Sequence, residues 1–340
     1  MSMMDRRTIL QLGSAALAAG AVAKPALAQT AAAGKNTLDA YSRTLQWLRT
    51  PEEVAQACHE IGNTSIDLTL RVYPGHVDPA KAKTDLPPFV NGLKRNGITV
   101  SLLTTPLSDA NTPNLETILD TAASLGIHHI WWRGATTDEK DPYPKQLDAA
   151  KRQVEGLAKV LEKYKFKAVY HPLGGFGGNF ADMMDLCRNF DPRTIAIQYD
   201  TGNFHQFNQI NLVSQIKIAG PYVGAFVFKD FVVEKLAPQP GRGAGGDAEG
   251  GGGRGGNGSV NGWSSRQVPV GTGVLNLPLI CQAMKEIDFH GPIECQPEWP
   301  ELGGPNQGLD KLSIPRAEVM RMLKRDFATV SAPLAAAGVI

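Results

Sequence analysis

The sequence predicts an α/β protein, and within that class a (β/α)8 TIM barrel. Short apolar runs alternate with segments of helical periodicity eight times between residues 44 and 298, which is the pattern of parallel strands joined by helical crossovers. Residues typical of helix starts and helix ends recur at the boundaries. An open doubly wound sheet is the alternative, but it usually carries a glycine-rich turn after its first strand, and none follows residues 44–49. The barrel is therefore favoured.

Each predicted strand is a short run that is rich in apolar residues. The eight runs are 44–49, 65–71, 99–105, 128–134, 167–172, 195–200, 223–230 and 292–298. The helices expected between them are 51–61, 86–96, 115–125, 145–164, 180–190, 210–218 and 277–287. The first helix shows the boundary signals, because Thr50 and Pro51 precede two acidic residues and Gly62 follows the last periodic residue.

Polar residues of the predicted strands keep to one phase of the two-residue repeat. Asp67, Thr69 and Arg71 alternate with apolar residues in the second strand, as Gln198 and Asp200 do in the sixth. Helices cover the outside of a barrel, so the polar phase is expected to point inward. Any one such residue could belong to a structural ion pair, but six near the strand ends predict a shared polar pocket on the catalytic face. They are Arg71, Arg133, His171, Asp200, Lys229 and Glu298.

Further polar residues are expected at this pocket because they follow strands or share the inward phase. His76 comes after Tyr73-Pro74-Gly75, beyond the second strand, while Asn203 and His205 follow the sixth. Gln296 shares the face of Glu298. We expect His76, Asn203 and Gln296 to contact a substrate, although each loop histidine could equally be an ordinary surface residue.

This set of side chains suits a polyhydroxylated substrate that has a carbonyl group. A carboxylate or a histidine can remove the proton next to the carbonyl, while a cation stabilises the enolate that forms. His171, Asp200 and Glu298 also offer nitrogen and oxygen ligands for a divalent Mn, Zn, Mg or Co ion. The sequence contains no serine nucleophile elbow, P-loop or dinucleotide fingerprint.

Residues 1–28 resemble a twin-arginine export signal and are not expected to be part of the fold. Arg6 and Arg7 precede a short, alanine-rich apolar stretch, and Ala26-Leu27-Ala28 forms a cleavage pattern. An ordinary secretory signal is the alternative, and the stretch is too short for a stable membrane helix. We expect the twin-arginine translocase to export the folded protein to the periplasm.

The charge of the remaining chain is close to neutral. The full chain has a formal charge of +1. Without residues 1–28 it has 31 basic and 32 acidic side chains, and the formal charge is −1. This balance argues against a nucleic-acid partner and gives no electrostatic attraction to a membrane. Residues 29–38 are expected to be a linker, 39–330 the barrel domain and 331–340 a C-terminal tail. The four cysteines have no C-x-x-C spacing and are expected to be buried and free.

One segment of the barrel domain has an unusual composition. Residues 238–262 hold 12 of the 36 glycines and almost no apolar side chains, so a disordered insertion is expected on the pocket face. A lid is the alternative, with Trp263 as the residue expected to reach a substrate.

The chain resembles the sugar phosphate isomerase/epimerase family of xylose isomerase-like TIM barrels. The resemblance covers residues 40–325 and rests on the order and spacing of several stretches. These are 66–71 with Pro74-Gly75-His76-Val77, Val169-Tyr170-His171, 198–203, Phe228-Lys229-Asp230-Phe231, 269–273 and 291–299. The resemblance implies one active site and, in typical members, a divalent metal held by Glu, Asp, His and Glu on strands five to eight.

Only part of that ligand set is present. Asp200 matches the family's aspartate, but His171 stands where the first glutamate is usual and Val227 where the histidine is usual. Gln296 aligns with the last glutamate, and Glu298 follows two residues later on the same face. Valine cannot bind a metal, so the usual set is broken.

Two kinds of site are then open. Either a metal site is rebuilt from His171, Asp200 and Glu298, with or without Gln296, or the protein works without a metal and Lys229 supplies the positive charge.

The sequence thus predicts an exported isomerase or epimerase that acts on a sugar or keto-sugar. His171 or Glu298 would remove the proton, Lys229 or a metal would stabilise the enediolate, and Arg71 and Arg133 would position substrate oxygens. The alternatives are a keto-glycoside lyase or hydratase on the same barrel, and a catalytically degenerate barrel that binds a carbohydrate. An apurinic endonuclease is disfavoured by the export signal and the charge.

Overall fold

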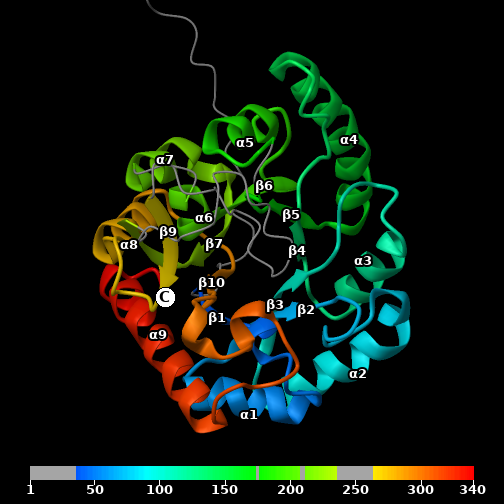
Figure 1. Ribbon diagram of the computed structural model, residues 1–340. Coiled ribbons are helices and arrows are strands. Elements are labelled where there is room, and N and C mark those ends of the chain that lie inside the picture. The colour runs from blue at the N-terminus through cyan, green and yellow to red at the C-terminus, as the bar shows by residue number, and fades with distance from the viewer. Residues whose placement is uncertain (1–35, 174–175, 207–210, 236–262) are drawn as a thin grey trace, which may run out of the picture. The chain divides into compact units, whose positions relative to one another are not determined.

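Eight parallel strands close into a barrel at the centre of the protein. The computed structural model describes residues 36–173, 176–206, 211–235 and 263–340. Around the barrel the strand order is β1-β10-β7-β6-β5-β4-β3-β2, and helices surround the strands on the outside (Figure 1). The predicted TIM barrel is confirmed. The predicted export signal at 1–28, most of the linker and the glycine-rich segment 238–262 lie outside the described residues.

The strands and helices alternate as the sequence pattern predicts. The strands of the barrel are β1 Leu38–Tyr41, β2 Ser65–Thr69, β3 Thr99–Thr104, β4 His129–Trp132, β5 Lys167–Tyr170, β6 Ile195–Asp200, β7 Val223–Phe228 and β10 Ile293–Cys295. The helices are α1 Pro51–Ile61, α2 Ala82–Arg95, α3 Leu115–Ser124, α4 Tyr143–Tyr164, α5 Phe180–Cys187, α6 Thr201–Gln206, α7 Leu212–Ala219, α8 Leu277–Glu286 and α9 Arg316–Ala337.

Local sequence signals explain where α1 begins and ends. The Thr50 hydroxyl accepts a hydrogen bond from the backbone N–H of Glu53, and the Glu53 carboxylate accepts one from the backbone N–H of Thr50. This capping box satisfies two backbone donors that the helix leaves without partners. At the other end Gly62 takes a φ of 106°, a left-handed conformation that suits glycine.

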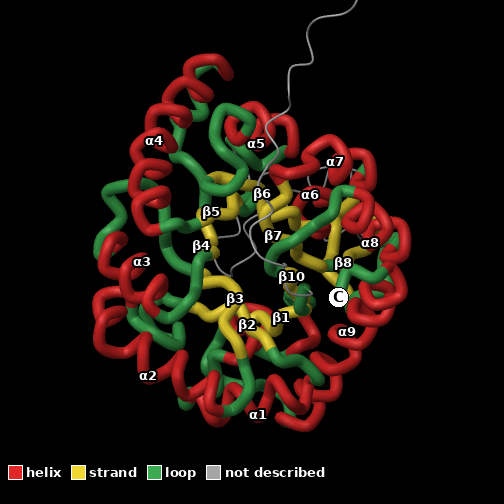
Figure 2. Tube along the Cα trace, turned by 180° about the vertical axis from the view of Figure 1, so that it is seen from behind, coloured by secondary structure: helices red, strands yellow, loops and turns green. Residues whose placement is uncertain are grey.

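The two ends of the barrel domain differ from the prediction. The strand expected at 44–49 is wrong: residues Ser42–Leu45 form a 3₁₀ turn, and the first strand is β1, which begins inside the expected linker. β1 has only four residues, all buried, so it carries no readable alternation. The expected tail at 331–340 is largely helical, because α9 continues to Ala337. α9 packs against α1 and α8 and completes the ring of helices (Figure 2).

A two-stranded antiparallel hairpin follows β7 and was not predicted. It consists of β8 Asp230–Lys235 and β9 Trp263–Val268, so the strand expected at 223–230 is divided into β7 and the start of β8. The Asp230 carboxylate fixes the loop after β9, since it accepts hydrogen bonds from the backbone N–H groups of Gly271, Gly273 and Val274 at 2.9, 2.9 and 3.0 Å.

The polar phase of the strands points inward, as predicted. Asp67, Gln198, Asp200 and Glu294 are fully buried, and several of them are joined by hydrogen bonds that cross the barrel interior. The alternate phase packs against the helices in one large apolar core. The four cysteines are buried and free, as expected. Among the described residues, the helices are too short or too polar to cross a membrane.

Candidate active site

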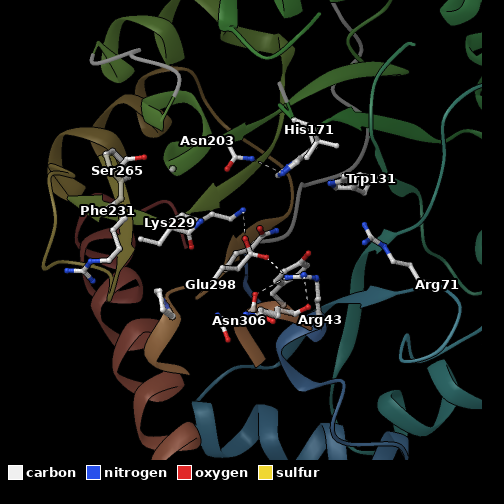
Figure 3. Close-up of a pocket in the computed structure, with 18 residues that line it drawn as sticks. Arg43, Arg71, Trp131, His171, Asn203, Lys229, Phe231, Ser265, Glu298 and Asn306 are labelled. Atoms are coloured by element: carbon white, nitrogen blue, oxygen red, sulfur yellow. Dashed lines mark hydrogen bonds and ion pairs between the residues drawn. The ribbon is translucent and has the colours of Figure 1, made fainter. Parts of the chain in front are cut away.

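A cavity of about 650 Å³ opens at the carboxyl ends of the barrel strands. Its volume lies within the range that is typical of small-molecule sites. Seven of the eight barrel strands contribute side chains to its wall (Figure 3). In six of them a contributing residue follows the end of the strand, and in β4 it lies within the strand. Its wall includes Tyr41, Arg43, Arg71, Trp131, His171, Asn203, Lys229, Ser265, Arg266, Gln267, Gln296, Glu298, Asn306 and Gln307.

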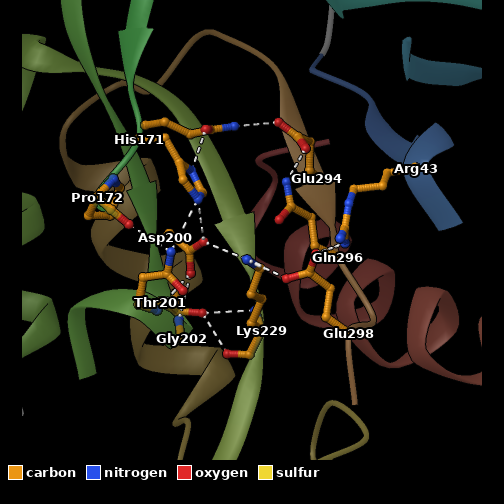
Figure 4. A network of polar contacts seen from close by, with 12 residues as sticks. Arg43, His171, Pro172, Asp200, Thr201, Gly202, Lys229, Glu294, Gln296 and Glu298 are labelled. Carbon is orange, nitrogen blue, oxygen red and sulfur yellow. Dashed lines mark hydrogen bonds and ion pairs between the residues drawn. The ribbon is translucent and has the colours of Figure 1, made fainter. Parts of the chain in front are cut away.

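The Lys229 ammonium group lies at the centre of the charged side chains. Its Nζ atom is 3.0 Å from Oδ2 of Asp200 and 2.9 Å from Oε2 of Glu298 (Figure 4). The other oxygen of Glu298 accepts a hydrogen bond from Nη1 of Arg43 at 2.6 Å. Two cations and two carboxylates thus form a balanced group at the floor of the cavity.

These ion pairs set the ionisation of the group. Burial works to lower the pKa of Lys229, but the carboxylates of Asp200 and Glu298 outweigh it, and the pKa is raised well above its ordinary value. Burial works to raise the pKa of Glu298, but Lys229 and Arg43 outweigh it and lower the pKa. At neutral pH Lys229 is therefore an ammonium and Glu298 a carboxylate.

Contacts between the residues that follow β6 and β7 hold Lys229 in place. The Thr201 hydroxyl donates a hydrogen bond to the carbonyl of Lys229 and accepts one from its backbone N–H. A Cβ atom on Gly202 would lie only 2.6 Å from Cβ of Lys229, so glycine is needed where the lysine side chain passes. Oδ1 of Asp200 accepts hydrogen bonds from the backbone N–H groups of Gly202 and Asn203, both at 2.9 Å, which leaves Oδ2 for Lys229.

His171 is held in one tautomer by a chain of hydrogen bonds. The amide nitrogen of Gln198 donates to Oε1 of Glu294 at 2.6 Å, so the amide oxygen of Gln198 accepts from Nδ1 of His171 at 2.7 Å. Nδ1 therefore carries the proton, and Nε2, at the cavity wall, accepts a hydrogen bond from the amide nitrogen of Asn203 at 3.1 Å.

The pKa of His171 favours the neutral ring. Burial, with a further effect of Lys229, lowers the pKa to about 4, and the attraction of Asp200 offsets this only in part. Nε2 lies 3.6 Å from Oδ2 of Asp200. If His171 accepts a proton, the Asp200 carboxylate stabilises the imidazolium that forms.

A second set of acidic side chains lies deeper in the barrel. Asp39, Asp67 and Glu294 are fully buried. Burial raises the pKa of Asp39 to about 6, and it also raises the pKa values of Asp67 and Glu294, each of which is raised further by its acidic neighbours. Hydroxyls rather than cations bind two of them: Ser101 donates to Asp39, and Thr104 donates to Asp67 at 2.5 Å. We name these three residues the acid layer.

Most of the predicted site residues meet in one place. Arg71, His171, Asn203, Lys229, Gln296 and Glu298 line the cavity, and Asp200 lies fully buried directly behind Lys229 and His171. Two predicted residues are placed elsewhere.

Arg133 is exposed and is not part of the cavity wall. His76 bonds through Nδ1 to the Thr69 hydroxyl at 2.8 Å and packs against Phe89, and it too is absent from the wall. Arg133 follows the end of β4 by one residue, as His171 follows β5, but its side chain is exposed to solvent and contributes nothing to the cavity wall. The side chain of His205 lies outside the described residues.

Several wall residues were missed by the sequence reasoning. Tyr41 and Arg43 were missed because the first strand was placed at 44–49, beyond both of them. Arg266 and Gln267 come from β9 of the hairpin, and Asn306 comes from the loop after β10. Their sequence surroundings carry no motif. Trp131 shares the two-residue phase of Arg133 in the predicted fourth strand. This shared phase is the one signal that could have identified Trp131 as a further wall residue.

The donor set does not fit a divalent metal. The ammonium of Lys229 already occupies the position between Asp200 and Glu298 that a cation would take, and Arg43 binds the remaining oxygen of Glu298. Over the described parts of the chain, no group of three His, Cys, Asp or Glu side chains is arranged to hold a metal ion. The positive charge at this site belongs to Lys229.

Solved structures share this fold at low sequence identity. D-Psicose 3-epimerase from Clostridium cellulolyticum H10, solved with D-tagatose, matches with a TM-score of 0.60 and 14% identity over 88% of this chain and 99% of its own. The IOLI protein, solved with a zinc atom, matches with a TM-score of 0.59 and 14% identity, over 87% and 98%. A probable 3-DHS dehydratase, AsbF from Bacillus anthracis, matches with a TM-score of 0.57 and 12% identity, over 87% and 98%.

The sequence itself carries a family signature. No curated protein matches the chain in sequence. The family model described as "Xylose isomerase-like TIM barrel" matches residues 55–320, which include all the strands after β1 and every cavity residue except Tyr41 and Arg43. The chain therefore belongs to the xylose isomerase-like TIM barrel family.

Proposed function

We propose that the protein is a sugar isomerase or epimerase that moves a proton next to a carbonyl group. The observation that carries this proposal is the pairing of a neutral histidine with a fixed ammonium: Nε2 of His171 and Nζ of Lys229 lie 3.6 and 3.0 Å from the same oxygen of Asp200. A base and a cation that lie this near to each other can act on neighbouring atoms of one substrate.

In this proposal Lys229 binds the substrate carbonyl oxygen. The ammonium donates a hydrogen bond to the oxygen and stabilises the negative charge that develops as the neighbouring carbon loses its proton. Two carboxylates fix the lysine before substrate arrives, so no reorganisation is needed as the charge forms.

His171 is the base of the first step. Nε2 removes the proton from the carbon next to the carbonyl, and the product is an enediolate together with an imidazolium that Asp200 stabilises. Return of the proton to the other carbon gives an isomer, whereas an epimer forms when a second proton donor protonates the opposite face of the same carbon. Gln198 keeps the reactive nitrogen pointed at the cavity throughout.

The solved neighbours support a sugar as the substrate class. The D-psicose 3-epimerase structure contains D-tagatose, a ketose. In this chain the ammonium of Lys229 lies between the carboxylates of Asp200 and Glu298 and would supply the positive charge. We also propose that residues 1–28 direct export to the periplasm, which makes free or oxidised sugars more suitable candidates than sugar phosphates.

Exchange with solvent tests the chemistry before a substrate is known. The protein is incubated in deuterium oxide with a panel of ketoses, aldoses and oxidised sugars, and deuterium next to the carbonyl is measured by NMR. We expect exchange with at least one sugar and loss of it in His171→Gln. The control variant is His290→Gln, at an exposed histidine before β10 on the opposite barrel end.

The outcome also separates the alternatives. Loss of water or of a glycosidic substituent from the substrate would indicate a hydratase or lyase, which shares the same first step. Sugar binding without exchange or product would refute the enzyme proposal and indicate a carbohydrate-binding barrel.

A further inference from the structure

One cation of the cavity wall has no acidic partner among the residues with described positions. Arg71 follows β2 and is partly buried in the wall, with its guanidinium 5.2 Å from the centre of the Trp131 ring. Its Nε atom is buried, and no acceptor for it exists among the residues that the structure describes. Figure 3 shows the guanidinium group on the side of Trp131 away from His171 and Lys229.

The other cations of the wall are all neutralised. Arg43 is paired with Glu298 at 2.6 Å, and Lys229 with Asp200 and Glu298. Arg266 is paired with Glu234 at 3.0 Å. In the described part of the chain, Arg71 is therefore the cavity arginine without an ion pair.

In the described structure the acidic side chain of Asp67 forms no ion pair with Arg71, although the guanidinium works to lower its pKa. Asp67 lies on β2 below Arg71, inside the acid layer, where Thr104 binds one of its oxygens. Its other oxygen has no hydrogen-bond partner among the described residues, so it is not bonded to the guanidinium. Among the described residues, the cavity wall thus carries one positive charge that has no ion pair, held on a planar and partly exposed donor.

We propose that Arg71 binds a carboxylate group of the substrate, so that the enzyme acts on an anionic sugar such as a sugar acid. This inference rests on the proposed function and names its substrate class. A guanidinium presents two parallel N–H donors that match the two oxygens of a carboxylate. A single negative charge would neutralise the cavity, whereas a phosphate dianion would leave an excess negative charge beside one arginine.

The layout places this group away from the reacting carbons. The Trp131 ring is 5.5 Å from the ring of His171 and 5.2 Å from the Arg71 guanidinium. A sugar that spans the Trp131 face has its carboxylate at Arg71 and its carbonyl carbon at His171 and Lys229. Aromatic faces commonly support the apolar faces of ligands in such pockets.

Equilibrium binding tests the proposal without requiring turnover. Isothermal titration of the full-length protein compares D-glucuronate and D-gluconate with D-glucose and with D-glucose 6-phosphate. We expect at least one of the sugar acids to bind more tightly than the neutral sugar and the phosphate. In Arg71→Gln we expect that affinity to fall roughly 10- to 100-fold, as for a lost charged hydrogen-bond pair, with glucose binding unchanged.

Two further variants make the result specific. Arg71→Lys keeps the positive charge but lacks the two parallel N–H donors of the guanidinium, so an intermediate affinity for the sugar acid is expected. Arg193→Gln removes an exposed arginine just before β6, at the opposite end of the barrel, and is expected to bind like the wild type.

Three outcomes would overturn the inference. They are sugar acids that bind no better than glucose, a tighter complex with the phosphate, and an unchanged acid preference in Arg71→Gln. Tight binding of a sugar acid without solvent exchange would instead refute the proposed chemistry and leave the role of Arg71 in place.

Discussion

Two clusters of buried ionisable side chains lie in one barrel and differ in their charge. The mouth cluster is rich in ion pairs and consists of Arg43, His171, Asp200, Lys229 and Glu298. The acid layer below it consists of Asp39, Asp67 and Glu294 and has hydroxyl and amide partners. Both contain buried carboxyl groups, yet burial raises the pKa values in the acid layer, while cations lower that of Glu298.

The difference teaches that burial alone does not decide the charge of a carboxyl group. Glu294 and Glu298 are four residues apart, and the pKa of one is raised while that of the other is lowered. The contact of Glu298 with Lys229 and Arg43 accounts for the contrast. The mouth cluster can therefore hold and move charge, whereas the acid layer orients His171 through Gln198.

Removing Lys229 is expected to have the largest effect. In Lys229→Met the developing enediolate loses its charge partner, so kcat/KM should fall roughly 10²- to 10³-fold. Asp200 loses its cation, which should lower the free energy of unfolding by about 3 kcal/mol. Steady-state kinetics and chemical denaturation measure both. The control variant is Lys217→Met, at an exposed lysine of α7 paired with Glu286, and a similar loss there would show that charge removal in general is responsible.

Replacing His171 should affect chemistry more than stability. His171→Gln removes the base, and a loss of roughly 10²- to 10⁴-fold in kcat is expected, with KM changed little. Because the pKa of His171 is lowered to about 4, the ring is already neutral above that pH. The wild-type rate should therefore rise with pH through about 4 and then stay level to neutrality. A rate that still rises near pH 6.5 would show that another group is the base.

Replacing Asp39, which is not part of the hydrogen-bond chain to His171, should alter stability rather than catalysis. The pKa of Asp39 is raised by burial from 3.8 to about 6 in the folded protein. Between these values the folded state binds more protons than the unfolded state, so stability falls as pH rises from about 4 to 6. Asp39→Asn removes this dependence. The difference in the free energy of unfolding between variant and wild type should therefore be roughly 1–3 kcal/mol more in favour of the variant at pH 8 than at pH 4.

Denaturation at both pH values measures this effect, with Asp120→Asn, at an exposed acid of α3, as the control that should keep the pH dependence of the wild type. Equal pH dependence in Asp39→Asn and the wild type would contradict the raised pKa of Asp39 in the folded protein.

The sequence predicts the barrel well because its signals repeat. Strand and helix alternation, capping residues such as Thr50 and terminal glycines such as Gly62 are all local. β1 and the hairpin of β8 and β9 were missed, since β1 is four residues long and β9 lies beyond the glycine-rich segment. Their pairing depends on contacts between residues far apart in the sequence.

The candidate site is predicted in part for the same reason. Residues one or two positions beyond a strand, such as His171 and Lys229, follow from the alternation. Arg43 does not, because it follows a strand that the sequence does not reveal, and its role depends on Glu298, which is 255 residues away. The choice between a metal and a lysine also needed the structure, because only distances show that Nζ of Lys229 lies between the two carboxylates.

In the proposed reaction the ammonium of Lys229, rather than a metal ion, supplies the positive charge. The most direct measurement is the solvent-exchange activity of the wild-type protein after exhaustive chelation, with its metal content determined by elemental analysis. We predict full activity without bound metal and no increase when Mn²⁺, Zn²⁺, Mg²⁺ or Co²⁺ is added. Activity that is lost on chelation and restored by one of these ions would contradict the account.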